Sequence, residues 1–177
     1  MAQVEIQLLP ADVGEGLVGE LAALVNRVYA EAEAGLWAVD VPRTTEDELA
    51  EQIRAGEIAV AWLDGRIVGG VRVRRLESGE AEFGMLVAEP AHRGAGVGSR
   101  LVNFAEQRGR ELGAEVMQLE VLMPRSWKHP FKEYLDAWYT RLGYRVVRVG
   151  RFEESYPRLA PHLAGPCDFR VYQKGLR

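Results

Sequence analysis

The stretch that decides the fold runs from residue 82 to residue 120 and reads EFGMLVAEPAHRGAGVGSRLVNFAEQRGRELGAEVMQLE. An apolar strand comes first, a glycine-rich segment follows, and an amphipathic helix leads to a second apolar strand. Gly94, Gly96 and Gly98 stand at the mouth of that helix, where the first backbone N–H groups lack partners and carry partial positive charge. Because glycine has no Cβ, a phosphate group can reach these N–H groups directly. The stretch therefore predicts a site for a phosphate-bearing cofactor.

Three glycine-rich patterns compete for this segment. The dinucleotide-binding pattern Gly-x-Gly-x-x-Gly follows a first strand, whereas here the third glycine comes one residue early and the segment lies in mid-chain. The nucleoside-triphosphate loop ends in Gly-Lys-Ser/Thr, whereas Gly98 is followed by Ser99 and Arg100. The third pattern, Arg/Gln-x-x-Gly-x-Gly/Ala, is matched by residues 93–98 at each defined position.

With this match the chain resembles the GCN5-related N-acetyltransferase (GNAT) superfamily. Residues 86–93 (LVAEPAHR) resemble the family's fourth strand and its Pro-x-x-Arg approach to the pyrophosphate loop. Residues 138–144 (WYTRLGY) resemble its later Phe-Tyr-x-x-x-Gly-Phe signature. The two motifs occur in the family's order, with a strand between them, and the resemblance spans most of the chain.

The remaining elements follow from periodicity and turn signals. Asp64-Gly65 is typical of a two-residue hairpin, and Thr45 before three acidic residues indicates a helix N-cap. We expect an α/β fold with a GNAT-like mixed, mostly antiparallel central sheet, a splayed parallel pair and helices on both faces. The expected strands are 4–9, 57–63, 66–75, 80–88, 116–122, 144–152 and 169–173, and the expected helices are 16–31, 45–55, 98–112 and 130–142.

The resemblance implies which residues bind the co-substrate, acetyl-CoA. In the family the fourth and fifth strands splay apart, and freed backbone groups of Leu86, Val87 and Ala88 would pair with the pantetheine arm. One N–H there would face the thioester oxygen as an oxyanion stabiliser. The pyrophosphate would lie on the loop formed by Arg93, Gly94, Ala95, Gly96, Val97, Gly98 and Ser99.

Two catalytic residues follow from the same resemblance. Tyr139 matches the signature tyrosine that protonates the leaving thiolate or donates a hydrogen bond to the sulfur. Glu82 matches a glutamate that serves some family members as general base, with Glu120 or a water chain as alternatives. At the position seven residues before the tyrosine, where many members carry a pantetheine-binding asparagine, this chain has Lys132. Lys132 could donate a hydrogen bond, approach a phosphate or be a solvated charge.

Composition narrows the class of protein. The 177 residues fit one domain, expected over 1–177, and the net charge of −4 argues against a nucleic-acid partner. A single cysteine and no His/Cys cluster predict no disulfide and no metal site. No secretion signal or membrane-spanning run is visible, so a cytoplasmic protein without membrane contact is expected.

The function we expect is N-acetyl transfer from acetyl-CoA to a primary amine of a small molecule or peptide, by direct attack in a ternary complex. The acceptor would pass Tyr29, Trp37 and the 153–166 segment, a mixed aromatic and acidic wall compatible with a cationic amine. The alternatives are a non-catalytic acyl-CoA-binding or sensor module with the same fold, and an enzyme for longer acyl chains. The resemblance also leaves room for a homodimer.

Overall fold

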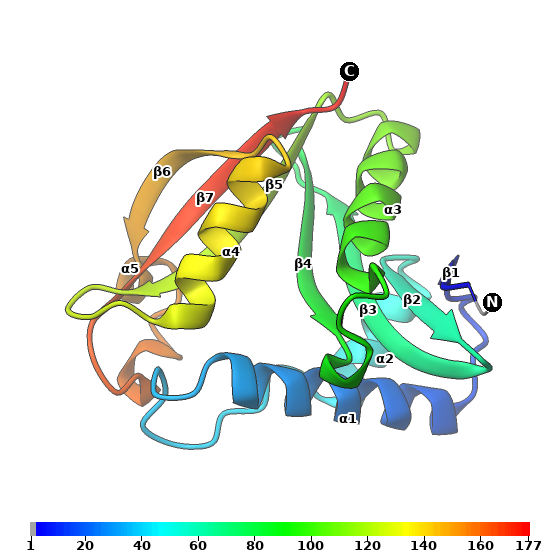
Figure 1. Cartoon of the computed structure of the whole chain (residues 1–177), viewed down its shortest axis with the longest axis horizontal. Coiled ribbons are helices and arrows are strands. Elements are labelled where there is room, and N and C mark those ends of the chain that lie inside the picture. The colour runs from blue at the N-terminus through cyan, green and yellow to red at the C-terminus, as the bar shows by residue number, and fades with distance from the viewer. Residues whose placement is uncertain (1–2) are drawn as a thin grey trace.

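The computed structural model describes residues 3–177, and its centre is a seven-stranded sheet in the order β1-β2-β3-β4-β5-β7-β6 (Figure 1). The neighbours β4 and β5 are parallel, and all other neighbouring strands pair antiparallel. The expected mixed, mostly antiparallel sheet is thereby confirmed. The strands are β1 (Glu5–Leu8), β2 (Ile58–Leu63), β3 (Arg66–Arg75), β4 (Ala81–Ala88), β5 (Val116–Pro124), β6 (Arg145–Arg151) and β7 (Cys167–Gly175).

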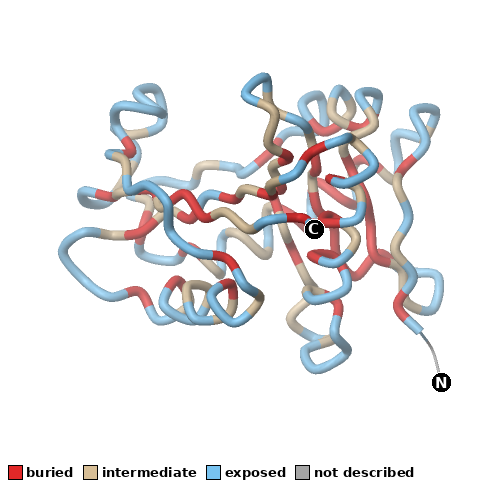
Figure 2. Tube along the Cα trace, turned by 90° about the horizontal axis from the view of Figure 1, so that it is seen from above, coloured by how far each residue is buried: buried red, intermediate tan, exposed pale blue. Residues whose placement is uncertain are grey.

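Helices cover both faces of the sheet, as expected (Figure 1). One apolar core, with Leu21, Val25, Leu49 and Ile53, lies under α1 and α2 and is called the α1/α2 core. The α3/α4 core, with Leu101, Ala105, Met117 and Tyr139, fills the other face. In Figure 2 the buried residues follow the strands and the inner sides of the helices. The helices are α1 (Glu15–Ala32), α2 (Glu46–Arg54), α3 (Val97–Glu111), α4 (Pro130–Arg141) and the short α5 (Phe152–Ser155), with 3-10 turns η1 (Pro90–His92) and η2 (Ala160–His162).

The expected strands and helices are all present, with ends within two residues of their expected ends. Local chemistry explains this agreement. The Thr45 hydroxyl accepts a hydrogen bond from the backbone N–H of Glu48 at 3.2 Å, which caps α2. Asp64 and Gly65 have φ angles of 51° and 75°, the two positive values that a type I′ hairpin turn requires. No helix within residues 3–177 has both the length and the apolar character needed to span a bilayer.

The parallel strands β4 and β5 diverge after a short registered start. Only two residue pairs join the strands, Ala81 with Met117 and Glu82 with Gln118. Beyond these pairs β4 and β5 are not paired with each other. In Figure 1 the two strands separate towards α1. The expected splay of the parallel pair is therefore present, and it leaves backbone groups on the facing edge of β4 without ladder partners.

A bulge at Met85 changes the direction of the side chains along β4. Met85 has a φ of 52°, which is rare for a residue with a side chain, and the β3–β4 register shifts beside it. Phe83 packs in the α3/α4 core, whereas Met85 and Val87 pack in the α1/α2 core. Strand residues two apart normally point to the same face of a sheet. The bulge therefore reverses which face each side chain of β4 points to, in the part of the strand beside the splay.

Two connections join the halves of the molecule on the far side of the splay. The segment after α1 pairs with the segment between β6 and β7, because Ala38 N–H donates to His162 O at 2.8 Å and Ala164 N–H donates to Leu36 O at 2.9 Å. Leu36, Phe152 and Cys167 form a small buried cluster beneath this contact. The short β4–β5 ladder thus joins the two halves at one end of the splay, and the contact between the two connections joins them at the other end.

Candidate functional site

The glycine-rich loop between β4 and α3 has the geometry of an open anion site. Gly94 and Gly96 have φ angles of 87° and 77°, and Gly96 is the N-cap residue of α3. A Cβ on either residue would have no atom of the described chain within 4 Å beyond its immediate neighbours, so the loop has open space beside both glycines. The first backbone hydrogen bond of the helix runs from the N–H of Arg100 to the carbonyl oxygen of Gly96, at 3.0 Å. The N–H groups of residues 97–99 therefore precede the helical ladder and face outward.

Gly98 has a different role from the other two glycines. It lies in the first turn of α3, and a Cβ there would stand 3.3 Å from the ring of Trp138 on α4. Its small size allows the two helices to approach, whereas Gly94 and Gly96 supply the backbone angles. The sequence suggests that all three glycines open the backbone at the mouth of the helix. In the structure this reason holds for Gly94 and Gly96, whereas Gly98 makes room for Trp138.

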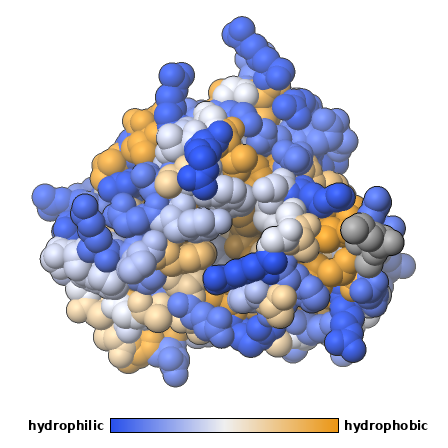
Figure 3. All heavy atoms as spheres, viewed as in Figure 1, coloured by the Kyte–Doolittle hydropathy of each residue, from blue (hydrophilic) through white to orange (hydrophobic). Residues whose placement is uncertain are grey.

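Leu86, Val87 and Ala88 lie on β4 beyond the last residue that pairs with β5. Val87 and Ala88 pair with Gly70 and Gly69 of β3, so only the edge towards β5 is open. The space-filling view is hollowed at the middle of this face, where Figure 1 places β4 between α3 and α4, and apolar residues line its floor (Figure 3). The open edge of β4 and the glycine loop thus border one continuous region.

Tyr139 lies on α4 at the side of this region. It is buried, and its ring lies 6.1 Å from Phe83 and 6.0 Å from Tyr144. Burial raises the pKa of the Tyr139 hydroxyl well above its usual value, and the neighbouring Tyr29 and Tyr172 raise it further. Tyr29 belongs to α1 and packs against the core on the opposite side of the sheet, so its effect on the pKa of Tyr139 acts across the sheet. The Tyr139 hydroxyl is therefore a neutral donor throughout the physiological pH range.

Glu82 belongs to a row of polar side chains that crosses four strands on the α1/α2 side of the sheet. Arg74 Nη2 donates to Glu82 Oε1 at 3.0 Å, and Gln118 Nε2 donates to Glu82 Oε2 at 2.9 Å. Gln173 Nε2 donates in turn to Gln118 Oε1 at 2.9 Å. The carboxylate is held in place by two donors, and 16% of the side chain remains exposed.

Glu120 lies on the same face, two residues along β5 from Gln118. It is exposed, and its Oε2 accepts a hydrogen bond of 2.6 Å from the Tyr156 hydroxyl. Tyr156 follows α5 and packs on Phe152 and Phe169. Burial raises the pKa of Tyr156 first, and the charges of Glu120 and Glu82 raise it further. Both candidate bases therefore lie near this one hydroxyl group.

Lys132 is a hydrogen-bond donor, one of the three roles that the sequence leaves open, and its partner is a carboxylate of the chain itself. It is buried, and its Nζ donates to Glu33 Oε2 at 2.7 Å, while Glu33 Oε1 accepts from Trp37 Nε1 at 3.1 Å. Glu33 follows α1, so the ion pair joins α1 to α4 across the splay. His129, one residue before α4, adds a contact of 3.0 Å between Nε2 and Ala34 O. Lys132 is therefore committed to a buried ion pair, and it is not a solvated charge.

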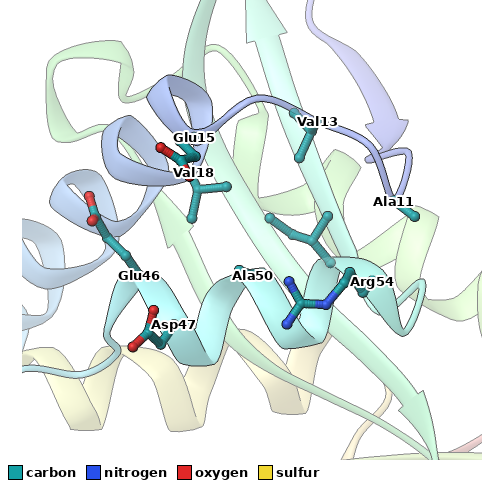
Figure 4. Close-up of a pocket in the computed structure, with 9 residues that line it drawn as sticks. Ala11, Val13, Glu15, Val18, Glu46, Asp47, Ala50 and Arg54 are labelled. Atoms are coloured by element: carbon teal, nitrogen blue, oxygen red, sulfur yellow. The ribbon is translucent and has the colours of Figure 1, made fainter.

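A separate groove lies between α1 and α2 (Figure 4). It has a volume of about 390 Å³, and Glu15, Glu46, Asp47 and Arg54 supply its charged side chains. None of the predicted site residues lines it, so this groove is not the candidate site. Within residues 3–177, no three His, Cys, Asp or Glu side chains are grouped in a way that could hold a metal ion.

The predicted residues thus fall into two groups on the two sides of the splay. Leu86, Ala88, the loop 93–99 and Tyr139 border the α3/α4 side, whereas Val87, Glu82 and Glu120 lie on the α1/α2 side. Sequence reasoning missed Tyr156 as a partner of Glu120, and it missed Glu33 as the partner of Lys132. Their separations of 36 and 99 residues leave no local signal.

Comparisons with known proteins agree with this geometry. Residues 24–144, more than half of the chain, match the model of the family described as Acetyltransferase (GNAT) family. No curated protein sequence matches at a significant level.

Solved structures resemble the fold of the chain at low sequence identity. An aminoglycoside 6′-N-acetyltransferase complexed with coenzyme A has a TM-score of 0.73 and 17% identity, with 98% of this chain and 97% of that chain covered. The PaiA N-acetyltransferase of Thermoplasma acidophilum, in complex with coenzyme A, has a TM-score of 0.71, 15% identity, and coverages of 98% and 99%. The N-acetylglutamate synthase of Neisseria gonorrhoeae, complexed with coenzyme A and N-acetyl-glutamate, has a TM-score of 0.68 and 15% identity. All of this chain is covered there, but the chain spans only 36% of that synthase.

Proposed function

Because the chain belongs to the GNAT acetyltransferase family, we propose that it is an N-acetyltransferase that moves acetyl from acetyl-CoA to a primary amine. The acceptor is a small molecule or a peptide, and its amine attacks the thioester directly while both substrates are bound. One domain, residues 1–177, carries the whole activity. The observation that supports the proposal most is the open loop at the N-terminus of α3 beside the unpaired edge of β4.

The chain offers each substrate group a matching partner. The outward N–H groups of residues 97–99 and the positive end of α3 suit the pyrophosphate, with Arg93 and Ser99 exposed beside them. The free edge of residues 86–88 suits the amide groups of the pantetheine arm, and one N–H there stabilises the oxyanion that forms on the thioester carbonyl. Bound coenzyme A in three similar structures supports this choice of co-substrate.

Binding and turnover test the proposal separately. Calorimetric titration with acetyl-CoA is expected to give micromolar binding, with adenosine 3′,5′-bisphosphate and NAD as comparison ligands. An amine panel with thiol-release detection is then expected to show acetyl-CoA-dependent turnover. Binding without turnover of any amine would contradict the enzyme and leave the acyl-CoA-binding module, whereas absence of acetyl-CoA binding would overturn the whole proposal.

Tyr139 donates a hydrogen bond to the leaving sulfur in this proposal. A hydroxyl group with a raised pKa is a poor source of a proton for a thiolate, whose conjugate thiol has a pKa of about 8.5. The same hydroxyl stabilises developing negative charge by donating a hydrogen bond, which strengthens as the C–S bond breaks. Of the two roles expected from the sequence, the second fits the environment of Tyr139 better.

Replacing Tyr139 by Phe is expected to lower kcat by about 10- to 100-fold, since a hydrogen bond to a charged group contributes about 1.5–3 kcal/mol. The KM for acetyl-CoA should change little, because the bond forms mainly as the thiolate leaves. Tyr134→Phe, an exposed change on the same helix, is the matched control. Full activity of the Tyr139→Phe enzyme would remove Tyr139 from the catalytic set.

Glu82 is the proposed general base, and Glu120 is the alternative on the same face. A carboxylate base accepts the amine proton only when it is ionised, so its protonation gives kcat/KM an acidic limb. We expect Glu82→Gln to lower kcat/KM and abolish that limb, whereas Glu120→Gln and the nearby Glu80→Gln should retain it. The pH–rate profile of the three variants decides the matter, and the reverse pattern would assign the base to Glu120.

A further inference from the structure

A cation without a carboxylate partner lies beside Tyr29, one of the residues that the acceptor is expected to pass. Arg43, in the segment between α1 and α2, is exposed and lies over the ring of Tyr29, with 5.1 Å from Cζ to the ring centroid. Across the part of the chain that the structure describes, no carboxylate lies within 4.0 Å of its guanidinium. A planar guanidinium stacked on an aromatic ring keeps its N–H edge free for a carboxylate.

The position of Arg43 is fixed by its neighbour in the chain. Thr44 is buried, its N–H donates to Asn26 Oδ1 at 3.0 Å, and its carbonyl accepts from Asn26 Nδ2 at 3.0 Å. These two bonds tie the segment to α1, three residues before Tyr29. The backbone beneath Arg43 and the ring on which it stacks are therefore both fixed to one helix, which holds the guanidinium in place before any ligand arrives.

A carboxylate without a cationic partner lies on β5. Glu120 accepts a hydrogen bond only from Tyr156, at 2.6 Å, and among residues 3–177 it is in no salt bridge. The charges of Glu120 and Glu82 act on the Tyr156 hydroxyl to raise its pKa, and the charge of Arg43 acts to lower it. The connection that carries Arg43 and the connection that carries Tyr156 are also joined by the backbone hydrogen bonds from Ala38 to His162 and from Ala164 to Leu36, so the unpartnered cation and the unpartnered carboxylate lie at the same end of the molecule.

We propose that the acceptor is an amino acid with a free carboxylate, which Arg43 binds, while Glu120 and Glu82 receive its ammonium end. This inference rests on the proposed function and adds the substrate class to it. The two opposite charges of an amino acid complement the two unpartnered charges, whereas a diamine would leave Arg43 facing a cation. The ammonium loses one proton to the base, and the neutral amine nitrogen then forms the new C–N bond. As the C–S bond breaks, the nitrogen releases its second proton to water, and coenzyme A leaves as the thiolate.

Matched pairs of acceptors test the inference. Each α-amino acid is compared with its own carboxamide at fixed acetyl-CoA, with thiol release as the readout. The preferred amino acid should exceed its carboxamide by about 10-fold or more in kcat/KM, because only the acid offers a charged partner to Arg43. Arg43→Gln should lower kcat/KM for the acid by about 10- to 100-fold, mostly through KM, and change that of the carboxamide less than about threefold.

Two further variants separate charge from structure. Arg43→Lys keeps the charge without the planar fork and should restore part of the preference for the acid. Arg66→Gln removes an exposed arginine at the start of β3 and should leave both acceptors unchanged. Acetyl-CoA binding and the melting temperature of Arg43→Gln should equal those of the wild type, since Arg43 is on the surface.

Two results would contradict the inference in different ways. Equal turnover of acids and carboxamides, or an equal loss of both in Arg43→Gln, would overturn the amino-acid class and leave an N-acetyltransferase for other amines. Acetyl-CoA binding with no turnover of any amine would overturn the proposed function, and the assignment of Arg43 would fail with it.

Discussion

Replacing Gly96 by Asp is expected to raise the dissociation constant for acetyl-CoA by at least about 100-fold, a loss of about 2.7 kcal/mol. Two physical effects combine. The φ of 77° at Gly96 is unfavourable for a residue with a side chain, so the loop is strained. The new carboxylate also occupies the open space at the positive end of α3, where it repels an incoming pyrophosphate. Calorimetric titration of the variant with acetyl-CoA measures the change.

Two controls separate these effects for Gly96. Gly96→Asn has nearly the same shape and the same tolerance of positive φ as Asp, and it should lose much less affinity because it adds no negative charge. Gly65 in the β2–β3 hairpin has a φ of 75° and equally open space around a would-be Cβ, so Gly65→Asp imposes the same strain and charge elsewhere. Undiminished acetyl-CoA binding by Gly96→Asp would show that the loop is only a helix entry.

Replacing Lys132 by Met is expected to lower the free energy of unfolding by about 3–5 kcal/mol, the usual cost of removing one partner from a buried ion pair. Only 6% of the Lys132 side chain and 10% of the Glu33 side chain are exposed, so the remaining carboxylate would stay in an apolar setting without its cation. Urea unfolding measures the change. The m value, which is the slope of the unfolding free energy against urea concentration, should be compared between variants.

The companion change in Glu33 identifies the cause of this loss. In the double variant Lys132→Met/Glu33→Gln no charge is left unpaired, and the amide oxygen can still accept from Trp37. The double variant should therefore be more stable than Lys132→Met alone. Lys128→Met, an exposed change just before α4, should stay within about 0.5 kcal/mol of the wild type. A double variant no more stable than Lys132→Met would show that packing, and not charge, explains the loss.

The parts of the fold that could be predicted are those determined by neighbours in the chain. The N-cap at Thr45, the hairpin at Asp64-Gly65 and the glycines before α3 each act over four residues or fewer, and the apolar periods of α3 and β5 show which sides are buried. Residues 82–122 alone therefore predict the strand, the crossover helix and the parallel strand, and the family signature predicts their splay.

The features that could not be predicted depend on contacts between distant segments. The sequence leaves Lys132 open as a hydrogen-bond donor, a neighbour of a phosphate or a solvated charge, and only the folded chain places it against Glu33, 99 residues earlier. Arg43 and Tyr156 come from two connections whose arrangement depends on the backbone pairing of their segments. Gly98 looks like its two neighbouring glycines, and only the approach of Trp138 distinguishes it. Residue type alone carries no information about such partners.

The polar row through Arg74, Glu82, Gln118 and Gln173 also affects how the sheet can be misassembled. A slip of one residue along β5 would turn Gln118 into the α3/α4 core and expel the buried Met117 and Leu119, and Gln118 would lose its hydrogen bonds to Glu82 on β4 and Gln173 on β7. The parallel pair β4–β5 has only two registered residue pairs to oppose such a slip. The alignment of the two halves of the molecule during folding therefore depends on side chains as well as on the backbone ladder, and the same row that holds the candidate base selects the correct register.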